Sequence, residues 1–171
     1  MTYVQGIPSI DAIVKRLAAQ PAQIEKALKR AIAATTRWGS NEARSGIAKA
    51  LRIRITALKG RVRVYIRLSE NVGKGWFGLT DLPSARLNPI QTATGARMDG
   101  MAEMPHAFVQ RMKNGRRLMM IRETKARFPI QQVKLPIREV GMEVLETRVF
   151  PRIEAKLNEE FEKELNWELS K

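Results

Sequence analysis

The chain of 171 residues contains no cysteine, and this absence excludes disulfide bonds, thiolate metal sites and cysteine nucleophiles. His106 is the only histidine, so one chain cannot form a histidine-rich metal cluster. No apolar run approaches the roughly 18–20 residues that a membrane span needs, and no signal peptide is visible. We therefore expect no membrane contact, and a protein that folds in a reducing cytoplasm.

The motifs of common enzyme and binding chemistries are also missing. The sequence has no GxGxxG, Walker A, HExxH or GxSxG motif, and no zinc finger, RNA-recognition motif or basic-zipper heptads. A single histidine without a nucleophile or an arranged acid beside it is more often structural than catalytic. We expect a protein that is not an enzyme, with no catalytic residue, no metal and no cofactor.

Positive charge is what the sequence has in excess. Lys and Arg number 31 against 17 Asp and Glu, which gives a net charge of +14 and a pI of 10.8. The net charge is +11 over residues 1–68, −1 over 69–105, +8 over 106–138 and −4 over 139–171. A basic body of this kind predicts a nearby polyanion or acidic partner surfaces. The alternative, a merely solvated basic surface, is weakened by so large a charge on so short a chain.

Helical spacing appears at both ends of the chain. Ser9 is a candidate cap for a short helix over residues 10–19, and Pro21 suits the first position of a second helix. The Gly39-Ser40-Asn41 step either ends this second helix or only weakens it. In the latter case one long helix runs from Pro21 to about Ala50. Residues 137–171 form a C-terminal helical segment, in which Pro151 should kink or restart the helix.

Residues 51–58 and 61–68 both alternate with period two around Lys59-Gly60, which predicts a β-hairpin. Its apolar side, with Phe108 and Ile121 from later in the chain, should be buried. The predicted buried residues of this hairpin are Leu51, Ile53, Ile55, Val62, Val64 and Ile66. The opposite side would gather Arg52, Arg54, Arg63 and Arg67 into a basic face that either is solvated or meets DNA phosphates or a partner's acids. In the alternative interpretation residues 51–58 finish a helix and only 61–68 is a strand.

The middle and later parts of the chain predict further elements. Residues 69–105 are rich in glycine and proline and predict a long loop or inserted arm with a short strand near 76–79. Within this segment, Trp76 and Phe77 either anchor the loop in the core or contact another subunit. Residues 107–112 and 117–124 flank an Asn-Gly step, which predicts a second hairpin with a type I′ turn.

These elements predict an α+β fold in a single domain over residues 1–171. An antiparallel sheet built from the two hairpins would pack against the long N-terminal helix and the C-terminal helix. Six glutamates lie between Glu154 and Glu168. We expect this acidic helix to meet a basic surface of a neighbouring subunit or partner protein, with Glu159, Glu160 and Glu164 as candidate assembly contacts.

One stretch of the sequence resembles a known family. Residues 106–116 (HAFVQRMKNGR), followed by Arg127-Phe128-Pro129-Ile130 and Val133-Lys134-Leu135-Pro136, are similar to the minor tail protein Z family of tailed bacteriophages and prophages. The order of elements over residues 21–150 is also similar. The close match is confined to residues 106–136, joins two segments at a fixed spacing, and carries no catalytic chemistry.

The resemblance implies a structural virion protein that acts in tail completion near the head-proximal end of a phage tail. It further implies, by analogy, a homo-oligomeric ring, other tail or head-tail connector proteins as partners, and assembly in the bacterial host cytoplasm. A DNA contact independent of base sequence would suit a ring around a DNA channel. The alternative function is a free, sequence-nonspecific nucleic-acid-binding protein, which only the pI and the arginine-rich strands support.

Overall fold

The computed structural model describes residues 21–122, 124 and 127–170, so the short helix expected over residues 10–19 lies outside the described residues. The chain folds into two compact units. Of the described residues, the first unit contains those up to Ala43, Val62–Phe77 and those from Leu145 onward; the second contains those within Arg44–Arg61 and Gly78–Val144. Helices dominate the first unit and short antiparallel strands the second, which confirms the α+β prediction.

Helix α2 (Pro21–Ala50) is one uninterrupted helix of 30 residues, so the long-helix alternative is correct. Gly39 and Ser40 do not end it. Both are buried, and a Cβ added at Gly39 would lie 3.5 Å from Val149 Cγ1. Val149 therefore lies within contact distance of Gly39, and an added methyl group would fit between them.

A left-handed residue ends α2. The Arg52 N–H donates to Lys49 O (3.2 Å), the Ile53 N–H donates to Ala48 O (3.0 Å), and Arg52 has φ of 53°. This pair of bonds is the Schellman motif, in which glycine usually occupies the position held here by Arg52. The apolar residue after it, Ile53, is buried in the same core cluster as Ala48.

The first predicted hairpin is therefore wrong. Residues 51–54 form the helix terminus just described, and residues Ile55–Leu58 form a 3₁₀ turn in which Ile55 is 47% exposed. Leu51 and Ile53 are apolar because they lie at the end of the helix, where Ile53 makes the apolar contact that accompanies a Schellman motif. They do not belong to a strand. The predicted strand 61–68 does form, as β1 (Val62–Arg67).

Strand β1 pairs instead with β2 (Val72–Phe77), antiparallel, with Val62 opposite Phe77 and Arg67 opposite Val72. The connection is a 3₁₀ turn, Leu68–Glu70, followed by Asn71 in the left-handed region. Of the side chains expected to be buried, Ile53 and Val62 are buried. Five others are half-buried: Leu51, Val64, Ile66, Phe108 and Ile121.

Glycines bring β2 onto helix α2. A Cβ added at Gly73 would overlap Thr36 Oγ1 and lie 3.1 Å from Ile32 Cγ2. A Cβ added at Gly75 would lie 3.8 Å from Ser40 Oγ. This face of the two strands is therefore pressed against the helix. Since side chains alternate along a strand, the residues between these positions face away from it.

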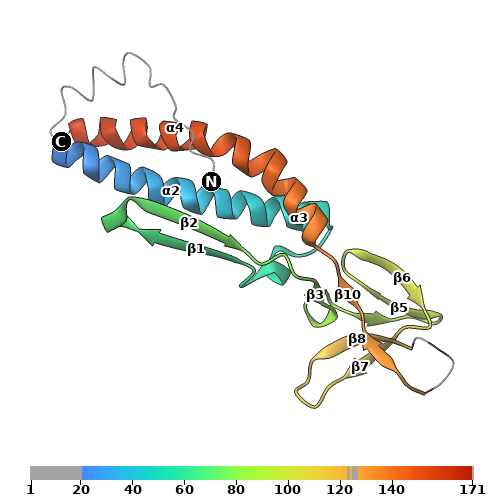
Figure 1. Cartoon of the computed structure of the whole chain (residues 1–171). Coiled ribbons are helices and arrows are strands. Elements are labelled where there is room, and N and C mark those ends of the chain that lie inside the picture. The colour runs from blue at the N-terminus through green and yellow to red at the C-terminus, as the bar shows by residue number, and fades with distance from the viewer. Residues whose placement is uncertain (1–20, 123, 125–126, 171) are drawn as a thin grey trace. The chain divides into compact units, whose positions relative to one another are not determined.

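The C-terminal helical segment has three parts: α3 (Arg138–Val144), a π-helical stretch (Leu145–Val149) and α4 (Phe150–Leu169). The expected restart at Pro151 is confirmed, because Pro151 stands in the first turn of α4 directly after the π-helical stretch. In the first unit α4 lies alongside α2 (Figure 1). Ala27, Ala31, Phe161 and Leu165 form the buried cluster between them.

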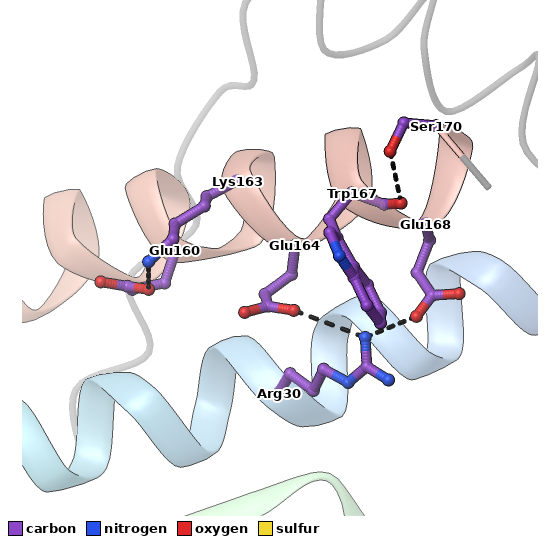
Figure 2. A network of polar contacts seen from close by, with 7 residues as sticks. All are labelled: Arg30, Glu160, Lys163, Glu164, Trp167, Glu168 and Ser170. Carbon is purple, nitrogen blue, oxygen red and sulfur yellow. Dashed lines mark hydrogen bonds and ion pairs between the residues drawn. The ribbon is translucent and has the colours of Figure 1, made fainter.

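Arg30 joins these two helices by polar contacts (Figure 2). Its guanidinium lies 2.5 Å from Glu168 Oε1 and 3.6 Å from Glu164 Oε2, and its Cζ lies 4.2 Å from the centre of the Trp167 ring. Glu168 is only 4% exposed, and the Arg30 guanidinium supplies a counter-charge to its buried carboxylate.

The second unit is built from short antiparallel strands. β3 (Leu82–Pro83) pairs with β10 (Lys134–Leu135). A second sheet contains β4 (Ile90–Gln91), β5 (Gly95–Met98) and β6 (Met101–Pro105), and a third contains β7 (Phe108–Arg111), β8 (Arg117–Arg122) and β9 (Ile130–Gln132). The long loop predicted for residues 69–105 is thus replaced by strands β2 to β6, and β2 overlaps the short strand expected near 76–79 only at Trp76 and Phe77.

A small polar centre lies inside the apolar core of this unit. Ser84, in the 3₁₀ turn Ser84–Arg86, is fully buried. Its hydroxyl accepts hydrogen bonds from the Met119 N–H (2.9 Å) and from Gln132 Nε2 (3.3 Å). The core around it includes Leu82, Leu87, Met98 and Ile137.

The second predicted hairpin is confirmed as β7 and β8, with Phe108 opposite Met120 and Arg111 opposite Arg117. Its turn differs from the type I′ turn expected. The Gly115 N–H donates to Met112 O, the Met112 N–H donates to Arg116 O, and only Gly115 has a positive φ, 78°. These features define a three-residue loop with a glycine bulge.

We predict that Arg52→Gly stabilises the protein by about 0.5–1 kcal/mol. Glycine removes the strain of a left-handed residue, roughly 1–2 kcal/mol. Part of that gain is offset because glycine also raises the conformational entropy of the unfolded chain. Arg54→Gly is the matched control. Arg54 has φ of −69°, so glycine relieves no strain there and only makes the unfolded chain more flexible, and this variant should be less stable by about 0.4–1 kcal/mol. Urea denaturation of both variants measures the difference, and a loss of stability in both would contradict the helix-end assignment.

We also predict that Arg30→Met lowers the free energy of unfolding by about 1–3 kcal/mol, because it removes a positive charge that pairs with the buried Glu168 carboxylate. Lys163→Met is the control. Lys163 is 72% exposed and lies 3.8 Å from Glu160, so its removal should change stability by less than about 0.5 kcal/mol. Thermal unfolding of the two variants compares them, and equal effects would show that the Arg30 contacts do not hold the helix pair.

Candidate functional site

The side of the β1–β2 pair that faces away from α2 combines basic and aromatic side chains. We call it the aromatic–basic face and define it by Arg63, Tyr65, Arg67, Lys74 and Trp76. The register places Arg63 opposite Trp76 and Tyr65 opposite Lys74. Since all five alternate with the residues pressed against the helix, they share one surface.

The two aromatic rings of this face are unusually exposed. Tyr65 is 51% and Trp76 46% exposed. The Arg63 guanidinium lies 5.2 Å from the centre of the Trp76 ring, a cation–π contact, and Arg67 pairs with Glu70 at 3.2 Å. Exposed Trp, Tyr and Arg are the residue types that dominate protein–protein contacts. The face is thus suited to bind a protein surface.

The four arginines predicted to share one face do not arise from one hairpin. Arg63 and Arg67 lie on β1 in the first unit, whereas Arg52 and Arg54 lie around the end of α2 in the second. Arg54 Nε is 3.7 Å from Asp99 Oδ2. Sequence reasoning also missed Lys74, because the glycines on either side of it hid the strand that carries it.

Trp76 and Phe77 point to opposite sides of β2. Trp76 belongs to the aromatic–basic face, while Phe77 lines a cavity of about 190 Å³ with Thr35, Ser40 and Ile153. Among the described residues the hydroxyls of Thr35 and Ser40 have no hydrogen-bond partner. The cavity lining carries no acidic or basic side chain, and its polar side chains are the hydroxyls of Thr35, Thr36 and Ser40.

The candidate acidic contacts on α4 are largely engaged within the chain. Lys156 pairs with Glu159 (2.8 Å) and Glu160 (2.9 Å), and the hydrogen bond from Lys156 holds the pKa of Glu160 below its ordinary value. Glu164 faces Arg30. Of the three predicted contacts, Glu159 is the exposed one, so it is the most accessible to a partner.

The described part of the chain offers neither a metal site nor a membrane span. Within residues 21–122, 124 and 127–170, no group of three or more acidic or histidine side chains is placed to hold a metal ion. No helix in this same part is both long and apolar enough to span a membrane.

Comparison with known proteins places the chain in a family. Residues 7–171 match the family described as prophage minor tail protein Z, which extends the local resemblance at residues 106–136 to nearly the whole sequence. Neither the curated proteins nor the solved structures provide a match. With its long helix, its acidic C-terminal helix and its basic strands all inside the matched range, the chain belongs to the prophage minor tail protein Z family.

Proposed function

We propose that this protein is a structural, non-enzymatic component that completes phage tails near their head-proximal end, where its copies form a closed ring. The family match over residues 7–171 carries this proposal. Its partners are further copies of itself and other tail or head-tail connector proteins, and it is assembled in the host cytoplasm. The whole chain, 1–171, acts as one assembly domain.

The chemistry of the first unit supports contacts between copies. Its aromatic–basic face carries three cations and two exposed aromatic rings. Glu154, Glu159 and Glu162 of α4 supply carboxylates, of which Glu159 and Glu162 are exposed. Because the basic and acidic surfaces differ, a contact between them is head-to-tail, and a head-to-tail contact closes into a ring when its rotation permits.

Self-association tests the aromatic–basic face. We expect the wild-type protein to sediment as a closed oligomer and the double variant Trp76→Ala/Arg63→Gln to shift to monomer, because Trp and Arg supply most of the energy of typical interfaces. Met142→Ala removes an exposed apolar side chain elsewhere and should not alter the oligomer. A wild-type monomer at every concentration would refute the ring, and an unchanged oligomer in the double variant would refute this face.

The acidic side of the contact is tested by charge reversal. The double variant Glu159→Lys/Glu162→Lys should weaken the oligomer more at low salt than at high salt, because salt screens exposed charges. Glu160 and Glu164 are retained, since reversing them would disturb the Lys156 and Arg30 pairings within the chain. Reversal that leaves the oligomer intact at all salt concentrations would show that the helix is only solvated.

A free nucleic-acid-binding protein is the competing function. The second unit favours it, with 17 basic and 6 acidic side chains and hence a net charge of +11. Sedimentation with and without DNA separates the two. A second measurement adds the protein to tails that lack it and asks whether they then join to heads. A closed oligomer in the absence of DNA, together with restored joining of heads to tails, supports the tail function. A monomer that binds DNA tightly and does not restore joining supports the alternative.

A further inference from the structure

The end of the β7–β8 hairpin gathers positive charge that nothing in the described structure neutralises. Arg111 and Arg117 lie directly opposite each other, and Lys113 and Arg116 belong to the turn segment between them. Among the described residues none of these four cations makes an ion pair, and all four are exposed. We call them the hairpin cations; residues 107–122 contain no Asp or Glu.

The fold holds this charge in a fixed arrangement. The turn is closed by the Met112 and Arg116 backbone bond (2.8 Å), and the Arg116 N–H also donates to Asn114 Oδ1 (3.1 Å). Further along the same strands, Met119 is fully buried. Arg111 and Arg117 lie on the same face of the strand pair as Met119. They are nearer the turn, where this face leaves the core and is exposed.

A groove beside the turn adds a fifth cation. It has a volume of about 440 Å³ and is lined by Arg86, Asn114, Arg116 and Gln132, among others. Arg86 Nη1 donates to Lys59 O (2.6 Å) and Ala57 O (3.2 Å), which fixes the guanidinium. Its Nη2 carries two further N–H donors, and a guanidinium fork of this kind matches the oxygens of a phosphate.

We propose that the hairpin cations, with Arg86, form a surface that binds the phosphate backbone of duplex DNA without reading its bases. Duplex DNA carries one negative charge about every 1.7 Å, a density that suits four clustered cations without an acid among them. The hairpin has no base-reading motif, so its contacts position the duplex and do not select a sequence.

An acidic protein is the less suitable partner for this surface. Residues 110–117 contain no aromatic side chain, whereas the main contacts of protein interfaces combine Arg with Trp and Tyr, as the aromatic–basic face does. The exposed carboxylates of the acidic helix, Glu159 and Glu162, are assigned in the proposed ring to the aromatic–basic face of a neighbouring copy, and Glu160, Glu164 and Glu168 are paired with Lys156 or Arg30 within the chain. The aromatic–basic face of the first unit has the opposite character and suits a protein partner.

The test compares two quadruple variants of the full chain with equal loss of charge. The first is Arg111→Gln/Lys113→Gln/Arg116→Gln/Arg117→Gln. The control is Arg52→Gln/Arg54→Gln/Arg63→Gln/Arg67→Gln, which removes the arginines that sequence alone suggested. Fluorescence anisotropy with labelled duplexes of two unrelated sequences, between about 50 and 200 mM salt, measures affinity and its salt slope.

We expect the wild-type protein to bind both duplexes equally. The hairpin variant should reduce the log–log salt slope by about 3–4, at roughly 0.9 for each phosphate that is no longer neutralised, while the control variant changes it by much less. The charge-conserving variant Arg111→Lys/Arg116→Lys/Arg117→Lys should retain the wild-type slope, and thermal unfolding confirms that each variant is folded.

Three results would overturn the proposal. The first is equal loss in both quadruple variants, which would make binding a matter of net charge alone. The second is unchanged DNA binding by the hairpin variant together with failure of tail joining, which would assign the surface to an acidic protein. The third is absence of wild-type DNA binding. The proposed tail function is judged separately, by oligomer size and by restored head joining.

Discussion

The close approach of strand β2 to helix α2 determines what the first unit presents to its surroundings. Gly73 leaves no room for a side chain on the helix side, because an added Cβ would overlap Thr36, and Gly75 lies near Ser40 on the same side. This side of β2 is therefore turned toward the helix. Lys74 and Trp76 therefore face outward, and the register brings Arg63 and Tyr65 to the same surface.

Different forces hold the other side of α2. Phe161 and Leu165 of α4 pack on Ala27 and Ala31, and the Arg30–Glu168 pair lies near the end of that contact. A buried carboxylate next to a half-exposed guanidinium adds specificity of alignment, because a shifted helix would separate Glu168 from Arg30. The carboxylates of α4 serve this pairing first, and only the exposed remainder is available to partners.

The sequence predicted the elements whose signal is local. Strand β1, the β7–β8 hairpin and the restart at Pro151 follow from period-two spacing and from proline geometry, while the uninterrupted α2 was one of two alternatives that helical spacing left open. The prediction of the first hairpin failed because the alternating apolar and basic residues at the end of a helix have the same period-two pattern as a strand. Ile53 is apolar to cover the end of α2, and Arg52 takes a conformation in which glycine would have marked the stop.

The partner of β1 was hidden for a related reason. Residues Val72–Phe77 contain two glycines, which lower the strand signal, and those glycines are explained only by a helix far away in sequence. The candidate site could be predicted only in part, for the same reason. Trp76 was identified by its type, but its pairing with Arg63 depends on a register that local spacing cannot give. The exposed charge of the β7–β8 turn was visible as a net +8 over residues 106–138.

Arg111 opposite Arg117 gives the β7–β8 hairpin an unusual relation to dissolved ions. Like charges facing each other across two strands repel, and the repulsion is weakest when counter-ions gather between them. Added salt therefore tightens the hairpin while it competes for the same surface. A bound polyanion supplies the counter-charge and also occupies the surface. The fraction of hairpins that are bound and the local order of the hairpin therefore rise together.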